Sequence, residues 1–360
     1  MDGINRHILT VSRALCKRGV DVAVCIAQSG GEFAAALKAV GVPAYSLNAR
    51  NGHDMRILWR LCKIMREFKP DIVHIHVLPF MARVLFSVKY GRIKFVSTTH
   101  GISDPIVKMA VRDGIGSFLS KLFRLNILAT CYVSKGVMKA CGNEGDRIKE
   151  VIYNPVDDCV HKRNLLRLEL GLGDCVPIVG TACRIAAVKS PDAFVAVMME
   201  VLRKVPMAHA VVLGAGDPVF ERQMRDVVSN SGMSSRFHLL GYRPNSAELI
   251  ADFDCFVMTS QREGMPTALL EAMMSRTSIA FWKGEGGLQD LVAMNEQSGP
   301  FALVAENGDI SGLADGIVGL ISDKKRKEDM INIAFDVCKS NFSVDAVIPK
   351  MINAYNKICQ

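Results

Sequence analysis

The chain has 360 residues and a mass of 39.4 kDa, and its 49% hydrophobic and 22% charged residues are the balance of a globular protein of about two domains. No apolar run reaches the roughly 18 to 20 residues of a membrane span, and no leader with a cleavage site is recognisable, which argues against an integral membrane protein and against secretion. The 11 scattered cysteines, odd in number and without a Cys-x-x-Cys pair, are typical of reduced thiols in a cytoplasmic protein.

The net charge of +8 is unevenly distributed along the chain. Residues 1–155 hold 23 Lys and Arg against 11 Asp and Glu, a net +12, whereas the remainder holds 21 against 25, a net −4. A basic half suggests an anionic partner such as a phosphate ligand, an anionic lipid or nucleic acid. A solvated surface without a partner is an equally open interpretation.

Short apolar runs typical of buried strands alternate with longer periodic stretches typical of helices. In the first half the predicted elements are helix 6–18, strand 21–27, helix 32–40, helix 56–68, and strands 71–76, 94–99 and 128–133. In the second half they are strand 176–183, helix 191–204, strand 210–213, helix 220–230, strand 237–240, helix 246–251, strand 255–258, helix 267–275, strand 278–281 and helix 344–359. Repeated strand–helix units predict an α/β protein of two Rossmann-like domains with parallel sheets.

We expect an N-terminal domain over 1–157, a C-terminal domain over 158–340, and a final helix over 341–360 that packs back toward the N-terminal domain. Pro155 breaks any regular element near the boundary. A doubly wound domain should open with a buried strand, yet residues 1–3 lead directly into a helix. The first strand is therefore expected to be missing, either because the domain is unusual or because the chain starts one strand late.

The strongest chemical signal is a pair of glutamates, Glu263 and Glu271, separated by seven residues after the predicted strand 255–258. The end of such a strand places polar groups in the crevice where doubly wound folds bind ligands. Gly264 lets the backbone approach a ligand closely, and a carboxylate can accept hydrogen bonds from a ribose diol.

This segment resembles the Glu-x7-Glu motif of the retaining glycosyltransferases of family 4, which have the GT-B fold of two facing Rossmann-like domains. The resemblance extends along nearly the whole chain. Segments that are similar to the family's other motifs follow in the family's order: 2–7, 71–76, 98–101, 151–157, 183–189, 213–216 and 286–287.

The resemblance implies a role for each matching side chain. Arg184 and Lys189 would hold the diphosphate of a nucleotide-sugar donor, where fixed positive charge stabilises the leaving group. Glu271 would bind the donor ribose, Glu263 the donor sugar, and His100 the transferring sugar, although His100 is alternatively a packed and satisfied histidine. The leaving phosphate would take the acceptor's proton, so we assign no protein base.

The remaining expected site residues are glycines and one arginine. Gly3, Gly214 and Gly216 are expected in turns on the donor side, and Arg6 on the acceptor side. The chain departs from the family pattern at four positions, which are Asp2 and Asn5 in the first loop and Cys183 and Ser190 beside the diphosphate pair. These departures keep the charges but change the loop residues.

We expect no metal ion and no cofactor beyond the nucleotide-diphosphate sugar as co-substrate, because no Asp-x-Asp stands where a divalent metal site would be. His74 and His76 share one face of a predicted strand, and their spacing alone would allow a two-histidine metal site. No third ligand is evident from the sequence, so we do not assign such a site.

Two basic amphipathic segments stand out in the first half. One is helix 56–68 with Lys69, and the other covers 108–124. Each would suit an anionic membrane surface, or simply be a solvated helix that packs by its apolar side. We expect no nucleic-acid partner, because no aromatic residues or recognisable module accompany the charge.

The sequence therefore predicts a retaining, metal-independent hexosyltransferase-type enzyme of cell-surface polysaccharide synthesis. It would move a sugar from a nucleotide-diphosphate sugar to a glycan or lipid-linked acceptor, in the cytoplasm or peripherally on the inner face of the cell membrane. The alternatives are a sugar-nucleotide epimerase of the same fold and a non-catalytic truncated homologue.

Overall fold

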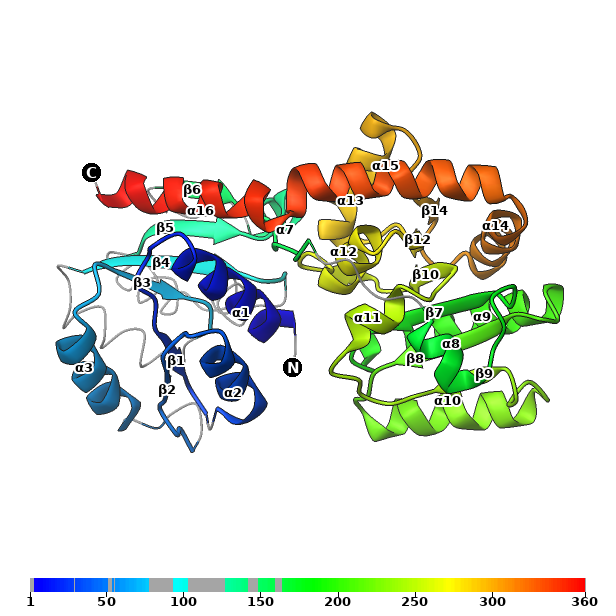
Figure 1. Cartoon of the computed structure of the whole chain (residues 1–360), viewed down its shortest axis with the longest axis horizontal. Coiled ribbons are helices and arrows are strands. Elements are labelled where there is room, and N and C mark those ends of the chain that lie inside the picture. Colours follow the sequence, from blue (N-terminus) through cyan, green and yellow to red (C-terminus); the bar gives the residue numbers. More distant parts are fainter. Residues whose placement is uncertain are drawn as a thin grey trace, which may run out of the picture. The chain divides into compact units, whose positions relative to one another are not determined.

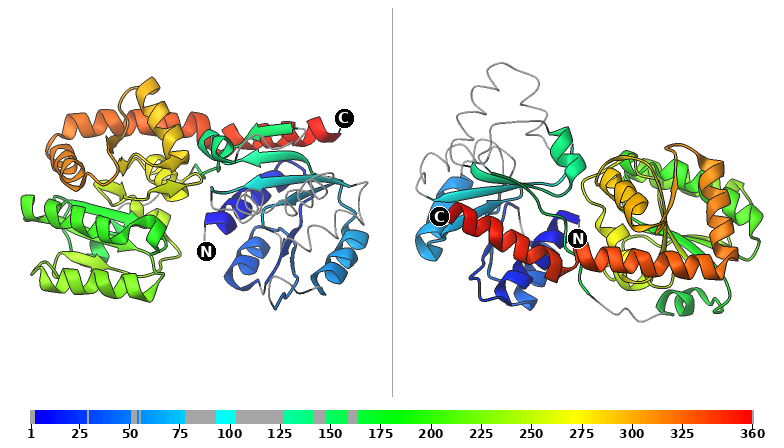
Figure 2. Two further views of the ribbon diagram at one scale, coloured as in Figure 1. Left: turned by 180° about the vertical axis from the view of Figure 1, so that it is seen from behind. Right: turned by 90° about the horizontal axis from the view of Figure 1, so that it is seen from above.

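The computed structural model describes residues 3–28, 30–50, 54, 56–77, 93–102, 127–141, 148–158 and 164–359. The chain divides into two compact units (Figures 1 and 2). The N-terminal unit combines residues 1–155 with 344–360, and the second unit is residues 156–343. The chain therefore passes between the units twice, after Pro155 and after Ser343.

The N-terminal unit alternates helices and strands. Its described elements are α1 (Gly3–Cys16), β1 (Val24–Ile26), α2 (Gly31–Ala39), β2 (Ala44–Ser46), α3 (Arg56–Phe68), β3 (Ile72–Ile75), β4 (Lys94–Thr99), β5 (Ile127–Tyr132), α7 (Lys135–Ala140), β6 (Ile148–Val151) and α16 (Val344–Cys359).

The described strands of the N-terminal unit form two parallel sheets. One has the order β1-β2, and the other has the order β3-β4-β5-β6. Two small cores accompany them: Val24, Phe33, Leu37 and Val42 form one, and Leu47, Ile57, Leu61, Met65, Ile75 and Phe95 form the other. This unit therefore lacks one continuous sheet among its described strands.

The last helix, α16, completes the N-terminal unit. It contacts α1 and β5, and Figure 1 shows it, in red, running alongside the sheet. Its buried side is Val347, Ile348, Met351, Ala354 and Ile358. Ion pairs join Arg18 to Asp345 at 2.5 Å and Glu150 to Lys357 at 2.5 Å, so the end of the chain is tied to its beginning.

The second unit has one parallel sheet of six strands in the order β14-β12-β10-β7-β8-β9. Its strands are β7 (Ile178–Ala182), β8 (His209–Leu213), β9 (Phe237–Leu239), β10 (Cys255–Met258), β12 (Ser278–Trp282) and β14 (Leu303–Ala305), with a small separate pair β11 (Arg262–Glu263) and β13 (Glu285–Gly286). Its helices are α8 (Leu165–Leu170), α9 (Pro191–Lys204), α10 (Pro218–Asn230), α11 (Ser246–Ile250), α12 (Thr267–Met274), α13 (Gly287–Ser298), α14 (Ile310–Ser322) and α15 (Lys324–Phe342).

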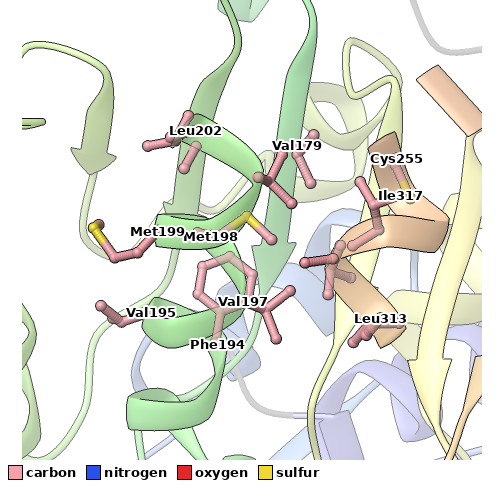
Figure 3. Close-up of a cluster of buried hydrophobic side chains, with 14 of the residues drawn as sticks. Val179, Phe194, Val195, Val197, Met198, Met199, Leu202, Cys255, Leu313 and Ile317 are labelled. Carbon is pink, nitrogen blue, oxygen red and sulfur yellow. The ribbon is translucent and has the colours of Figure 1, made fainter. Parts of the chain in front are cut away.

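Helices cover both faces of this six-stranded sheet (Figures 1 and 2). On one face, α9 packs against α10 and α14, and Figure 3 shows Phe194, Met198 and Leu202 of α9 meeting strand residues and α14. On the other face, α12 packs against α11 and α15. Because both faces are covered, the strands are mainly apolar, as the sequence predicted for buried parallel strands.

Local signals set the helix starts in the second unit. Pro218 and Pro191 stand in the first turns of α10 and α9, where a missing amide is tolerated. Asp217 caps α10 by accepting a hydrogen bond from the Val219 amide at 2.9 Å.

In the part of the chain that the structure describes, no helix is long and apolar enough to cross a bilayer.

Candidate active site

The carboxyl ends of β7, β8, β10 and β12 lie at one edge of the six-stranded sheet, and the loops that follow them carry most of the expected site residues. Open α/β sheets bind ligands at this edge. A small pocket there is lined by residues that include Thr181, Cys183, Lys189, Thr259 and Ser260. The second unit therefore places its candidate site where its topology predicts one.

Arg184 and Lys189 follow β7, which ends at Ala182. Arg184 is exposed, and no hydrogen bond or ion pair joins its guanidinium to another described residue. Lys189 ends a short 3-10 turn, η1 (Ala187–Lys189), and its Nζ forms an ion pair with Oε1 of Glu263. The structure therefore brings together two side chains that we had assigned separately to the diphosphate and to the sugar.

The main chain around Lys189 is anchored to the loop after β10. Thr259 Oγ1 donates a hydrogen bond to the carbonyl of Lys189 at 3.1 Å. The next residue, Ser190, is buried and has a left-handed backbone with φ of +47°. An L-residue in this region costs about 1–2 kcal/mol relative to the right-handed region, so a glycine would be easier to accommodate here.

Gly214 and Gly216 allow the loop after β8 to press against the loop that carries Arg184. A Cβ on Gly214 would lie 1.8 Å from the carbonyl oxygen of Cys183, and one on Gly216 would lie 2.0 Å from that of Ile185. The Gly216 amide donates to Oε1 of Glu221 at 2.7 Å. Close packing of main chains therefore accounts for both glycines, and their role in donor binding stays a prediction.

Glu263 belongs to β11, which pairs with β13 beside the sheet edge. A Cβ on Gly287 would lie 2.4 Å from the carbonyl oxygen of Gly264, so these two loops also meet main chain to main chain. The Cys183 thiol beside Arg184 is buried, and burial raises its pKa to about 11. Cys183 is therefore neutral at physiological pH and is no candidate nucleophile.

Glu271 is the fifth residue of α12 and is 7% exposed. Its helix neighbours Leu269, Leu270, Ala272 and Met273 are all buried and apolar. A carboxylate in such surroundings is rare in protein interiors unless it is paired or has a function. Glu271 lies in the helix that follows Glu263, so the two glutamates belong to one continuous segment at this edge of the sheet.

The N-terminal unit carries Gly3, Arg6 and His100. Gly3 is the first residue of α1, and a Cβ there would meet nothing within 4 Å, so the expected tight glycine turn is wrong at this position. The helix was predicted to begin at Arg6, but its main chain is helical from Gly3 onward. Arg6 is half-buried on the same helix.

His100 directly follows β4 and belongs to a group of four histidines. His100 Nε2 and His76 Nδ1 are 2.9 Å apart, which is a hydrogen bond in which one ring donates to the other. The ring of His7, from α1, lies 5.0 Å from that of His100 and 5.4 Å from that of His76. Burial, followed by the neighbouring histidines, lowers the pKa of His7 and of His76 well below the ordinary value.

His74 of β3 stacks on His76, which directly follows that strand, with ring centroids 4.4 Å apart, so the two side chains lie on the same side of the chain. Its two ring nitrogens are occupied by hydroxyl groups, Nδ1 by Tyr355 and Nε2 by Thr98, each at 2.6 Å. Burial lowers the pKa of His74 to about 3. His74 is therefore a neutral, satisfied histidine, and the His74–His76 pair does not form the two-histidine metal site considered above.

Two of these partners could not be inferred from the sequence alone. Tyr355 comes from α16, at the opposite end of the chain, and no local pattern connects it with His74. His7 stands directly after Arg6 in a motif that we had quoted, but its burial toward the strand ends depends on how α1 packs.

The helix predicted over 56–68 is present as α3, and its apolar side is buried through Ile57, Leu61 and Met65. Arg56 pairs with Asp54 at 2.6 Å, and Arg60 donates to the carbonyl of Asn48 at 3.2 Å. The second basic segment, 108–124, lies outside the described residues.

Two α/β units with parallel sheets are the fold of the GT-B class of glycosyltransferase. Models of known families match both halves of the chain: Glycosyltransferase Family 4 matches residues 1–158, and Glycosyl transferases group 1 matches residues 176–323. The chain belongs to the group 1 glycosyltransferases of the family 4 type.

Two distant relatives match over most of the chain. The N-acetyl-alpha-D-glucosaminyl L-malate synthase of Bacillus anthracis is 23% identical over 88% of this chain and 82% of its own length. The UDP-Gal:alpha-D-GlcNAc-diphosphoundecaprenol alpha-1,3-galactosyltransferase of Escherichia coli is 23% identical over 99% and 90%. Among solved structures, Anabaena Alr3699/HepE in complex with UDP-glucose superimposes with a TM-score of 0.81 at 17% identity, over 99% of this chain and 96% of that one.

Proposed function

We propose that this chain transfers a sugar from a nucleotide-diphosphate sugar to a glycan or lipid-linked acceptor in cell-surface polysaccharide synthesis, with retention of configuration and without a metal ion. The observation that carries the proposal is the grouping at one sheet edge of exposed Arg184, the Lys189–Glu263 pair and buried Glu271. The relatives named above transfer N-acetylglucosaminyl or galactosyl groups, and the structural neighbour binds UDP-glucose.

The diphosphate would be held by charge rather than by a cation. Arg184 offers a planar guanidinium that has no anionic partner among the described residues, and it can bind two phosphate oxygens at once. Lys189 would share its ammonium between Glu263 and the phosphate, so it would already be oriented when negative charge develops on the leaving group. The departing phosphate would accept the acceptor's proton.

The two glutamates would divide the recognition of the donor. Glu271 would accept hydrogen bonds from the ribose hydroxyls. Glu263 would meet the donor sugar, and His100 of the N-terminal unit would donate to a sugar hydroxyl. We take the site to act from the cytoplasmic side, where nucleotide sugars are available.

Binding of a donor can be tested by thermal unfolding in the presence of a panel of nucleotide sugars. A donor present at about 100 times its Kd should stabilise the second unit by about 2.7 kcal/mol. Glu271→Gln should remove most of this stabilisation, whereas the matched control Glu328→Gln, at an exposed position of α15, should leave it unchanged. Equal stabilisation of both variants would contradict the assignment of Glu271.

Transfer can then be separated from other chemistry by following the donor. Release of free nucleotide that depends on an added acceptor, with a product of the same anomeric configuration, is the expected result. A changed sugar that still carries its nucleotide would indicate an epimerase, and donor binding without any turnover would indicate a non-catalytic homologue. Either result would overturn the proposed reaction.

We further propose that the N-terminal unit contacts an anionic membrane surface through α3. Trp59 on this helix is 71% exposed, and Lys63 and Arg66 are exposed beside it. Together with the net +12 of residues 1–155, an exposed tryptophan among basic side chains suits the headgroup region of a bilayer.

Sedimentation with phosphatidylglycerol vesicles tests this contact. Each basic residue near the surface contributes about 1 kcal/mol, so Lys63→Ala with Arg66→Ala should weaken binding about 30-fold. Arg222→Ala with Arg225→Ala, on the exposed side of α10, is the matched control. Equal binding to phosphatidylcholine vesicles would contradict the proposal.

A further inference from the structure

Three histidines of the N-terminal unit point their ring nitrogens toward a common point. They are His7 of α1, His76 after β3 and His100 after β4. One nitrogen from each lies within 4.8 Å of the other two, and His76 Nδ1 and His100 Nε2 are 2.9 Å apart. Tetrahedral zinc with Zn–N bonds of about 2.0–2.1 Å separates its ligand nitrogens by about 3.3 Å, which lies between the 2.9 Å separation and the 4.8 Å limit of this cluster.

His7 gives an independent reason to expect a ligand at this point. Its side chain is 2% exposed, and neither ring nitrogen makes a hydrogen bond of good geometry with a described residue, although the Asn154 side chain lies close enough to interact with the ring. Leaving a buried polar group unsatisfied costs about 1–3 kcal/mol. A ligand bound by His7 would remove that cost.

The surroundings of the three rings favour a metal ion over an anion. The three side chains that meet here are all imidazoles, which are preferred ligands of transition-metal ions. No carboxylate belongs to the cluster among the described residues. A set of imidazoles alone selects zinc, cobalt, nickel or copper ions over magnesium or calcium.

His74 would support the site without binding the ion. It stacks on His76 at 4.4 Å and is itself held by the hydroxyls of Tyr355 and Thr98. Groups that fix the orientation of a ligating histidine commonly change metal affinity by about 10–100-fold. The ring of His76 is therefore already oriented by its neighbours.

We propose that His7, His76 and His100 form a binding site for one divalent transition-metal ion of the Zn²⁺ class, with a fourth position open to water. The ion takes no part in the proposed transfer reaction. Because it would occupy His100, it would withdraw this side chain from the sugar and inhibit transfer. This second consequence rests on the proposed function, whereas the binding itself does not.

Cobalt provides a direct probe of the site. Chelator-treated protein titrated with Co²⁺ should show a visible d–d band that saturates at one ion per chain, without the strong near-ultraviolet band of thiolate ligands. His7→Gln, His76→Gln and His100→Gln should each weaken binding at least about 10-fold. A control that replaces the other described histidine pair, His209→Gln with His238→Gln in the second unit, should leave the band unchanged.

The site is also testable in the unaltered protein, which covers the case in which a variant fails to fold. Crystals soaked in Zn²⁺ should show an anomalous peak at the zinc edge within bonding distance of all three rings. A peak elsewhere, a cobalt band that needs His209 and His238, or a thiolate spectrum would overturn the proposal.

Inhibition is judged separately, as the ratio of transfer rates with and without Zn²⁺. We expect the Zn²⁺ concentration that halves the rate to rise at least about 10-fold in His7→Gln relative to the unaltered chain. If cobalt binds at the three histidines but Zn²⁺ leaves transfer unchanged, the assigned role of His100 is wrong and the metal site stands. If no donor supports transfer, the proposed function fails, and the cobalt and diffraction results still decide the site.

Discussion

The second unit packs its six parallel strands into one sheet with a continuous core on the face under α9 and α14, whereas the described strands of the N-terminal unit form a sheet of two and a sheet of four with two small cores. The charges proposed to hold the diphosphate belong to the well-packed unit, on loops that meet main chain to main chain. The histidine cluster belongs to the divided unit, and one of its supports comes from the last helix of the chain. The second unit therefore positions its charged side chains with loops of its own continuous chain. The N-terminal unit depends on α16, a segment far away in the sequence, to support its histidines.

Removing α16 should produce the largest difference in stability between the two units. A chain that ends at Ser343 loses five buried apolar side chains, of which the larger contribute about 1.5–3 kcal/mol each, so the N-terminal unit should lose more than about 5 kcal/mol of stability. Hydrogen exchange should rise sharply in β3–β6 and little in β7–β14. Lys350→Ala, on the exposed side of α16, is the control, and equal loss in both units would contradict the division.

Lowering the pH should have the next largest effect, because it should destabilise the N-terminal unit more than the second unit. His7 is buried and His74 and His76 are half-buried, and desolvation lowers the pKa of all three, to about 3 for His74, so below pH 6.5 the unfolded chain binds protons that the folded unit does not. Stability is therefore full above pH 6.5 and falls as the pH drops toward 3, by up to about 1.4 kcal/mol per pH unit for each histidine.

Urea unfolding between pH 7 and pH 5, with a chelator present, measures this slope. His74→Gln should make the N-terminal slope shallower. The second unit should respond less, because the pKa values of its His209 and His238 are lowered by burial that is only partial. The same slope in both units would contradict the prediction.

Arg184→Ala should leave folding intact and reduce turnover about 100- to 1000-fold, since it removes one charge-stabilising donor from the proposed leaving group. The exposed position predicts an unchanged Tm. Steady-state kinetics beside the control Arg225→Ala, from the exposed side of α10, provides the measurement. Full activity of Arg184→Ala would show that Arg184 does not stabilise the leaving group.

Ser190→Gly should produce the smallest effect, a stabilisation of the second unit by up to about 1 kcal/mol. Relief of the left-handed backbone at φ +47° outweighs the added freedom of glycine in the unfolded chain. Urea midpoints of the second unit report the change. A loss of stability would mean that interactions of the Ser190 side chain contribute more to stability than its left-handed backbone costs.

Strong periodic patterns predicted much of the fold. The bounds of α3, β4, α9, β10 and α16 agree with the structure, because each has a clear apolar face or an apolar run. The missed strands β2, β6 and β14 are short and only half-buried, so their sequences carry little strand signal. Helix α14 was missed because it contains Gly312, Gly316 and Gly319, which lower its intrinsic helix preference; a side chain at Gly316 would collide with Leu303.

For the candidate site, the sequence predicted the positions of the residues but not the contacts between them. Motif order located Arg184, Lys189, Glu263 and Glu271 on one sheet edge, since parallel strands end on the same side. The Lys189–Glu263 ion pair joins residues 74 positions apart, and the pairing of His74 with Tyr355 spans 281 positions. Contacts of this kind depend on tertiary packing, which no local pattern encodes.

The return of α16 to the N-terminal unit reverses the usual order of folding during synthesis. Domains generally fold as they leave the ribosome, the earliest first. Here the N-terminal unit must wait for a helix that follows it by roughly 190 residues, or about 10–40 s at about 5–20 residues per second. The second unit, which is continuous in the chain, can complete its core first, so the nascent N-terminal unit is the part exposed longest to chaperones and proteases.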